Sequence, residues 1–420
     1  MHPPALSTRN SRHTPLHDTE DRMQEVSAAR HPTHFDISPS RLAGAPAATV
    51  DEDVIAAVHH ELKLRCDELI AFGRTLDPVF ATDIAERLAA YTLGGGSRIR
   101  PRFLWWALRA CGGSDAETPA ALRIAAALEL IQSCALIHDD VMDHSAVRRG
   151  RPSFHAQLAL RYPARTREPV TESFAHSAAV LAGDLALSWA DDLVAGTDLD
   201  DPATRAGVRH LWRAMRTEMV AGQYLDLHGQ ATSSRSSVQA IRTVCLKTAR
   251  YTVERPLALG ATLAGADEST SRALGAAGRC AGIAFQLRDD LIGVFGDPTV
   301  TGKPSGDDIR SGKATYLIAL AHTRARATKD TSVTDILDSC RGDAELSEHT
   351  LAAVRDALVS TGAPERVERR IARLSRAAEH HLRAAHLSGP AADHLTALLR
   401  QIAAPREQHA TSAADRGSLR

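Results

Sequence analysis

The sequence predicts an all-α protein with a single large helical domain. The 420 residues are 44% hydrophobic but only 4% aromatic, and Ala and Leu dominate. These two residues are the best helix formers, and the strict alternation of apolar and polar residues that is typical of strands is missing almost everywhere. No repeat of roughly 33 to 45 residues is present, which argues against a solenoid. We therefore expect one domain over residues 46–405.

Pro and Gly mark the expected helix boundaries. Breaks fall at Asp77-Pro78, at the glycines 94–96 and at Gly112-Gly113. Residues 1–45 lack periodicity and contain no apolar signal segment, so we expect them to be a disordered extension. We expect residues 406–420 to be a flexible tail. Helices are expected over residues 49–76, 79–93, 101–111, 119–142, 154–161, 173–195, 202–230, 236–264, 267–296, 314–327, 331–340, 346–360, 363–386 and 390–403.

Composition limits the possible partners. The net charge of −1 gives no general attraction to nucleic acid or to anionic membranes. No uninterrupted apolar stretch reaches the 18 or so residues of a transmembrane helix, so no membrane span is expected. The six cysteines are widely spaced and form no CxxC pair, as in reduced core residues of a cytoplasmic protein. Any charge chemistry must be local.

The first acidic motif follows an apolar stretch, 125–137. Asp139 and Asp143 lie roughly 40° apart on a helix and one turn along, while Asp140 points to the flank. Carboxylates at this spacing repel each other unless a cation lies between them. In isolation, the motif is equally compatible with an acidic helix end on the surface.

A second acidic motif ends another apolar stretch about 150 residues later, with Asp289 and Asp290. The position one turn after Asp289 is Gly293, so we expect Asp289 to be its one strong ligand and Asp290 and Asp297 to be peripheral. Facing each other, the two motifs would form an all-oxygen site suited to Mg²⁺.

Basic residues cluster around these motifs. Only five of the 50 basic residues are lysine, so a lysine inside a motif suggests a need for a compact ammonium group. Any single pair of arginines near a glycine turn is more simply a solvated pair. Together, however, the basic residues suffice for two diphosphate groups; they are Arg98, Arg100, Arg148, Arg149, Lys247, Lys303 and Lys313. Neither a P-loop nor a dinucleotide-binding glycine motif is present.

Seven segments, taken in order, resemble the trans-isoprenyl diphosphate (polyprenyl) synthases over roughly residues 50–400, and geranylgeranyl diphosphate synthases most. They are Gly95–Pro101, Asp139–Asp143 followed by Arg148–Ser153, Leu181–Asp184, Gly222-Gln223 with Asp226, Lys247-Thr248, Phe285–Asp290 and Lys303–Lys313.

The resemblance implies that isopentenyl diphosphate condenses with an allylic diphosphate. Three Mg²⁺ ions would bridge the allylic diphosphate to Asp139, Asp143 and Asp289. The remaining roles that it implies fall to basic and polar side chains: Arg148, Lys247 and Lys303 around the allylic diphosphate, Thr248 and Gln286 beside the reacting carbons, Arg100 and Arg149 on isopentenyl diphosphate, and Lys313 in the last segment. It also implies a single large helical bundle of the isoprenoid synthase type around a central cavity, and a homodimer.

Two positions depart from the family pattern, which has lysine where this chain has Ser97 and histidine where it has Gln132. Gln132 lies seven residues before Asp139, about 20° from the same helical face, so it should still point into the site. We expect either weaker binding of isopentenyl diphosphate or compensation from Arg98.

Small side chains before the first motif bear on product length. Cys134 and Ala135 are small where family members that stop at fifteen carbons have aromatics, and Ile131 and Leu128 could form a floor one turn deeper. The expected product is the twenty-carbon geranylgeranyl diphosphate, with longer chains next; ordinary core packing is the alternative reading of these residues. A class I terpene cyclase and a non-catalytic subunit of a heteromeric synthase are competing functions, although both aspartate motifs and the Lys303–Lys313 segment argue against them.

Overall fold

The computed structural model describes residues 46–162, 168–296, 306–343 and 345–404. The chain divides into two compact units, Met1–Pro39 and Ser40–Arg420, and all described residues belong to the second. The predicted all-α class is confirmed. Strands among the described residues are limited to β1 (Val147–Arg148) and β2 (Arg151–Pro152), a short antiparallel pair where a plain loop was expected. The expected terminal segments, 1–45 and 406–420, lie outside the described residues.

Most helices begin and end close to the expected boundaries. Two expected helices contain π-helical segments: η2 lies in the stretch 79–93, and η3 lies in the stretch 236–264, where the Arg255 N–H bonds to the carbonyl of Arg250, five residues back. The helices are α2 (Ala47–Glu52), α3 (Val54–Leu76), α4 (Pro78–Phe80), η2 (Ala81–Ala85), α5 (Glu86–Leu93), α6 (Ile99–Ala110), α7 (Thr118–Met142), α8 (Phe154–Arg161), α9 (Glu168–Ala195), α10 (Pro202–Ala231), α11 (Ser237–Val244), η3 (Cys245–Glu254), α12 (Arg255–Leu263), α13 (Glu268–Phe295), α15 (Asp307–Arg310), α16 (Tyr316–Thr328), α17 (Thr331–Ser339), α18 (Glu348–Ser360), α19 (Ala363–Ala384) and α20 (Pro390–Ala403).

Helix α7 is the core helix of the described unit. It packs against α3, α5, α6, α8, α9 and α12, and residues such as Leu128 and Ile131 are fully buried. By length and composition it is the one described helix that could cross a membrane, but 78% of its most apolar window is buried inside the protein. That burial indicates a core helix, whose acidic end opens at the edge of the core.

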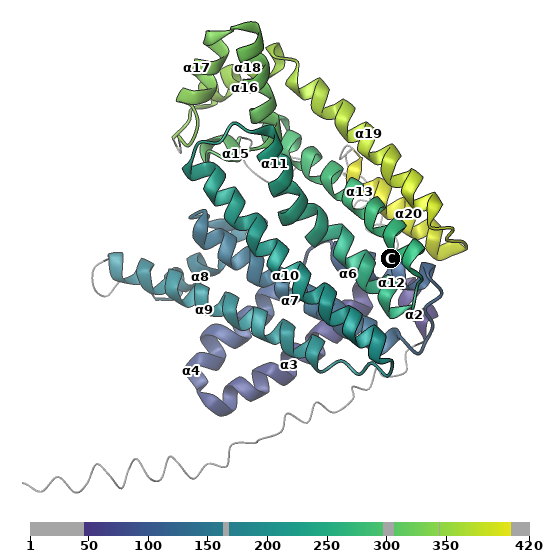
Figure 1. Ribbon diagram of the computed structural model, residues 1–420. Coiled ribbons are helices and arrows are strands. Elements are labelled where there is room, and N and C mark those ends of the chain that lie inside the picture. Colours follow the sequence, from purple (N-terminus) through teal and green to yellow (C-terminus); the bar gives the residue numbers. More distant parts are fainter. Residues whose placement is uncertain (1–45, 163–167, 297–305, 344, 405–420) are drawn as a thin grey trace, which may run out of the picture. The chain divides into compact units, whose positions relative to one another are not determined.

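Two hydrophobic clusters share α13. Ala277 and Ala281, in the first half of this helix, belong to a large cluster built around α7. Leu287 and Leu291, further along, belong to a smaller cluster with α11 and α15–α19. Figure 1 shows α16, α17 and α18 gathered beside α11 and α15 at one end of this unit. Asp289 and Asp290 therefore lie on the part of α13 that packs into the smaller cluster.

All six cysteines are free. Cys66, Cys134 and Cys340 are buried, and the other three are partly buried. Burial raises the pKa of the Cys66 and Cys134 thiols to about 12. These two thiols therefore remain protonated and unreactive near neutral pH, as expected for small core residues.

Gly222 allows α10 to contact η3 backbone to backbone. A Cβ atom at this position would lie 2.5 Å from the backbone nitrogen of Lys247. Real Cβ atoms do not come this close, so any side chain would push the two helices apart. Because Gln223 and Asp226 follow on α10, this contact also brings their side chains close to Lys247.

We predict that Gly222→Ala lowers the free energy of unfolding by about 2 kcal/mol, since overpacking costs about 1–3 kcal/mol. Gly275→Ala is the matched control, because a Cβ on this α13 glycine would meet nothing closer than 4.0 Å. The control should be neutral or stabilising by about 0.5–1 kcal/mol. Urea unfolding of both variants measures the difference, and equal stabilities would contradict the close-contact role of Gly222.

Candidate functional site

The first acidic motif is linked to two other helices through Lys247. Its Nζ atom lies 2.7 Å from Asp226 Oδ2 on α10 and 3.2 Å from Asp139 Oδ1 on α7. Gln223 Nε2 donates a further hydrogen bond to Asp139 Oδ1 at 3.1 Å. One ammonium group on η3 thus holds carboxylates from two different helices.

Lys313 makes a second bridge. Its Nζ atom lies 3.3 Å from Asp143 Oδ2 on α7 and 3.8 Å from Asp308 Oδ1 on α15. The segment that follows the second acidic motif is therefore tied directly to the first motif. Asp308 and Lys313, from the segment after the second acidic motif, thus lie beside Asp143 of the first.

Asp308 lies over Gly293. A Cβ at Gly293 would come within 2.9 Å of Asp308 Oδ2, so this carboxylate lies against the position one turn after Asp289. Sequence reasoning found no acid at that place because it followed α13 alone. The glycine itself was the available signal, since an absent side chain leaves room for one from another segment.

Asp139 and Lys247 stay charged near neutral pH. Burial raises the pKa of the Asp139 carboxyl, but Lys247, Lys313 and Arg148 outweigh it and hold the pKa below its ordinary value. Burial by itself lowers the pKa of the Lys247 ammonium, but the carboxylates of Asp139 and Asp226 outweigh burial and raise the pKa above its ordinary value. Opposite charges a few ångströms apart thus stabilise each other's ionised forms.

Asp140 and Asp290, the second aspartate of each motif, are buried. Burial, reinforced by Asp308, raises the pKa of the Asp290 carboxyl well above its ordinary value. Burial also raises the pKa of Asp140, although Arg148 Nε donates a 2.7 Å hydrogen bond to its Oδ1 atom. Within the described residues, the Oδ2 atom of each carboxyl is buried without a hydrogen-bond partner.

These residues fit a hard divalent cation that arrives with a phosphate ligand. No group of three or more His, Cys, Asp or Glu side chains among the described residues could hold a metal by itself, because the lysines lie between the carboxylates. Mg²⁺ is commonly held by one or two carboxylates together with substrate phosphates. The all-oxygen donor set and the unpartnered Asp290 oxygen are compatible with such a site.

Other predicted residues also meet. Thr248 Oγ1 donates a 2.8 Å hydrogen bond to Gln286 Oε1, and Gln286 Nε2 donates to Asp290 Oδ1 at 2.9 Å. This chain of contacts connects η3 to the second acidic motif. Arg148 Nη2 donates to Asp139 Oδ2 at 3.1 Å, so it is part of the same charged group. Lys303 lies outside the described residues.

Arg149 lies over the glycine turn. Its Nη1 atom donates a 2.6 Å hydrogen bond to the carbonyl of Gly95, and a Cβ at Gly96 would be 2.9 Å from it. Ser97 is exposed beside this guanidinium. Arg149 therefore supplies positive charge next to the place where the family has a lysine.

The expectation that Arg98 could compensate for Ser97 is wrong. The Arg98 side chain is buried in an ion pair with Glu129, and its Nη2 atom donates to the carbonyl of Thr92 at 3.0 Å. Its guanidinium is thus committed to the core, and a buried charge cannot leave its partner without a large free-energy cost.

The residues expected to control product length face different surroundings. Ile131 is fully buried and Ala135 is partly exposed. The Cys134 Sγ atom lies 3.8 Å from His138 Nδ1, and His138 Nε2 in turn lies 3.1 Å from the carbonyl of Val180 on α9. Cys134 therefore faces α9.

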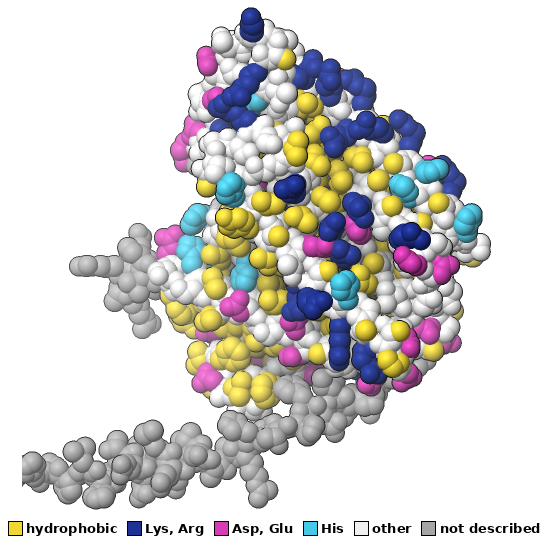
Figure 2. All heavy atoms as spheres, viewed as in Figure 1, with side chains coloured by type: hydrophobic (Ala, Val, Ile, Leu, Met, Phe, Trp, Pro, Cys, Tyr) yellow, Lys and Arg dark blue, Asp and Glu magenta, His cyan; other side chains and the backbone are white. Residues whose placement is uncertain are grey.

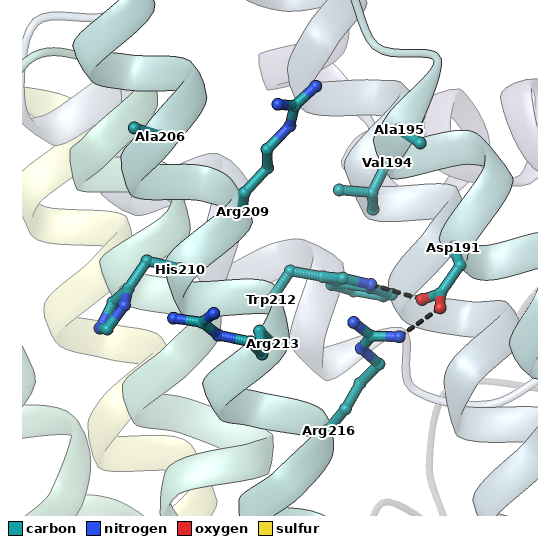
Figure 3. Close-up of a pocket in the computed structure, with 9 residues that line it drawn as sticks. All are labelled: Asp191, Val194, Ala195, Ala206, Arg209, His210, Trp212, Arg213 and Arg216. Carbon is teal, nitrogen blue, oxygen red and sulfur yellow. Dashed lines mark hydrogen bonds and ion pairs between the residues drawn. The ribbon is translucent and has the colours of Figure 1, made fainter.

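A separate groove of about 450 Å³ lies between the end of α9 and the first half of α10. In Figure 3, Asp191 accepts hydrogen bonds from Trp212 Nε1, at 2.7 Å, and from Arg216. The groove is lined by Asp191, Val194, Ala195, Ala206, Arg209, His210, Trp212, Arg213 and Arg216. None of the predicted site residues lines it, so it is distinct from the charged site.

Comparisons with known proteins agree with this geometry. The family model described as polyprenyl synthetase matches residues 82–354. The geranylfarnesyl diphosphate synthase of Aeropyrum pernix is 31% identical over 303 residues, which are 69% of this chain and 85% of that protein. The farnesyl diphosphate synthase of Geobacillus stearothermophilus is 35% identical over 269 residues, covering 61% of this chain and 82% of that protein.

A solved structure supports the same assignment. The geranylgeranyl pyrophosphate synthase of Corynebacterium glutamicum, complexed with isoprenyl diphosphate and magnesium, is 37% identical with a TM-score of 0.76, covering 83% of this chain and 99% of that one. The all-α architecture is thus the isoprenoid synthase fold. The matched region contains every predicted site residue, and the chain belongs to the polyprenyl synthetase family.

Proposed function

We propose that this protein condenses isopentenyl diphosphate with an allylic diphosphate to form an all-trans prenyl diphosphate, in a magnesium-dependent reaction. The observation that carries the proposal is a pair of lysine bridges at the first acidic motif: Lys247 joins Asp139 to Asp226, and Lys313 joins Asp143 to Asp308. They gather carboxylates for metal and cations for diphosphate at one place. The names of the relatives support the substrate class.

Ionisation of the allylic diphosphate is the first step. Asp139, Asp143 and Asp289 would hold magnesium, which neutralises charge on the departing diphosphate. Arg148, Lys247 and Lys303 would bind the same group, and the charges of Arg148 and Lys247 are in place at Asp139 before the carbon–oxygen bond breaks. Preorganised charge of this kind stabilises a developing anion more strongly than water does, because it need not reorient.

Condensation follows at the carbon that the diphosphate leaves. Arg100 and Arg149 hold the diphosphate of isopentenyl diphosphate, so that its double bond lies near the allylic cation. Thr248 and Gln286, joined by their hydrogen bond, line the reacting region. The new carbon–carbon bond leaves a cation on the isopentenyl part. This cation loses a proton from the adjacent carbon to the departed diphosphate and forms the new double bond, so no side-chain base is required.

Replacing either predicted aspartate ligand of α7, Asp139→Asn or Asp143→Asn, should lower turnover by about 10²–10³ or more. Removal of magnesium with a chelator should have the same effect on the unaltered protein. The assay uses purified full-length protein, magnesium, isopentenyl diphosphate and each allylic diphosphate in turn, with product analysis. Asp335→Asn, an exposed aspartate on α17, is the control and should be fully active.

The same assay separates the competing functions. Cyclic hydrocarbons formed from a prenyl diphosphate alone would show a terpene cyclase. No turnover with any allylic diphosphate would show a non-catalytic subunit. Elongated linear diphosphates are the outcome that supports the proposal.

We propose geranylgeranyl diphosphate as the main product, with a longer prenyl chain as the alternative. Ala135 is small, and the buried Leu128 and Ile131 lie deeper along α7. A growing chain that passes Ala135 would therefore meet bulky side chains further down. The relatives carry three different product names, so the proposal rests on these residues.

Ala135→Phe should shorten the main product by at least one five-carbon unit, because the ring would block the path beside α7. Chromatography of the dephosphorylated products measures the chain length. Ala135→Ser, which hardly changes the side-chain volume, is the matched control. An unchanged product from Ala135→Phe would contradict a path beside this residue.

We also propose a homodimer formed through α9 and α10. Large hydrophobic side chains on these helices are strongly exposed: Val180 (41%), Leu181 (64%), Val220 (62%) and Tyr224 (64%). Figure 2 shows hydrophobic side chains gathered over the face where α9 and α10 run. Exposed apolar patches of this kind usually mark an interface.

Leu181→Arg should therefore convert the protein to monomers, because a charge in an apolar interface loses its hydration without gaining a partner. Sedimentation velocity measures the oligomeric state. Val359→Arg is the control, since Val359 is 51% exposed on α18, away from this face. Dimers that persist in Leu181→Arg would argue against this interface.

A further inference from the structure

Two consecutive residues of η3 hold the guanidinium of Arg100. Nη2 donates a 2.9 Å hydrogen bond to Thr252 Oγ1, and Cζ lies 4.3 Å from the centre of the Tyr251 ring. Tyr251 and Thr252 are 3% and 4% exposed, so little water reaches these contacts. A cation over an aromatic face is attracted by the ring, and the attraction grows when water is excluded.

Arg100 Nε and Tyr251 Oη, on the two side chains of this contact, are buried and have no hydrogen-bond partner within the described residues. Gln132 Oε1 on α7 is a further buried atom without such a partner. Buried polar atoms are normally paired, so the two unpartnered atoms of the contact indicate a place for a polar ligand.

Helix α7 carries Gln132 into the same neighbourhood. Burial is the main reason that the pKa of the Tyr251 phenol is raised, and the α7 groups Cys134 and Glu129 add to the rise. The Tyr251 ring therefore lies near the turn of α7 that carries Gln132. Two predicted contacts of isopentenyl diphosphate, Arg100 and Gln132, thus approach Tyr251 from different helices.

The surroundings of Arg100 disfavour the charge on its guanidinium. Burial lowers its pKa, and Arg149 adds to the lowering, while Tyr251 and Glu129 oppose it. A guanidinium nevertheless remains protonated at neutral pH. With neutral Ser97 and Gln132 in place of the family's lysine and histidine, Arg100 and Arg149 are the predicted cations on this side of the site.

We propose that Tyr251 and Thr252 are positioning residues for isopentenyl diphosphate, and that they hold the Arg100 guanidinium in the orientation that binds its diphosphate. The inference rests on the proposed function, because the ligand is the second substrate of that reaction. Neither residue touches the reacting carbons. Tyr251 supplies the face on which the guanidinium lies, and Thr252 accepts the hydrogen bond that fixes its rotation.

The test is steady-state kinetics of four variants, with both substrates varied separately. Tyr251→Leu should raise the KM for isopentenyl diphosphate about tenfold, in keeping with the loss of a desolvated cation–π contact. Tyr251→Phe retains the ring and should stay within about threefold of the unaltered protein. Thr252→Val should raise the same KM about threefold to tenfold, and Thr252→Ser should restore it, because its hydroxyl again accepts the hydrogen bond.

The KM for the allylic diphosphate should remain within about twofold in all four variants. A loss of general core packing would change both KM values and kcat together. A rise in the KM for isopentenyl diphosphate alone therefore indicates a positioning role. Arg370→Leu is the control, because it removes a second arginine–tyrosine contact, 4.7 Å over Tyr316, and should leave both KM values unchanged. Tyr251→Phe and Thr252→Val nearly preserve side-chain volume, so the test survives if Tyr251→Leu fails to fold.

Unchanged KM values for isopentenyl diphosphate in Tyr251→Leu and Thr252→Val would overturn the inference, as would equal rises for both substrates. These results would leave the proposed function intact, since the variants would still turn over. Failure of the proposed function has a different signature: the unaltered protein would form no elongated diphosphate with any allylic partner.

Discussion

The site depends on the pairing of partly buried carboxylates with two lysine ammonium groups. Asp139, Asp143, Asp226 and Asp308 come from three helices, and repulsion between them would grow as water is excluded. Lys247 and Lys313 offset that repulsion by lying between the members of each pair. The bridges also tie α7 to α10 and α15, so the same contacts join the helices around the site.

The two kinds of basic residue have different tasks. A lysine ammonium is a compact charge that fits between two carboxylates, whereas an arginine guanidinium is a planar fork. In a chain with only five lysines, two occupy the bridges. Arginines take the flanks: Arg148 binds the carboxylates of the first motif, and Arg149 covers the glycine turn.

The two positions at which this chain departs from the family pattern both belong to the proposed binding site of isopentenyl diphosphate. Ser97 and Gln132 carry no charge, and Arg98 is committed to Glu129 in the core. Arg149 and Arg100 remain: Arg149 donates to the carbonyl of Gly95, and Arg100 donates to Thr252 Oγ1. At this part of the site the chain therefore departs from the family pattern at Ser97 and Gln132 and keeps it at Arg100 and Arg149.

The sequence by itself determined the all-α class, most helix boundaries, the shared face of Asp139 and Asp143, and the order of the charged segments. These properties are local, because helix propensity, breaks at Pro and Gly and spacing along one helix depend on neighbouring residues. Only the tertiary structure decided that Asp308 lies over Gly293, that Arg98 turns into the core, that Cys134 faces α9, and that Tyr251 and Thr252 hold Arg100. Each of these contacts joins segments that are far apart in the sequence, so spacing along one helix does not reveal it. For Tyr251 and Thr252 there is a second reason: they lie in the π-helical segment η3, where ordinary helical spacing does not apply.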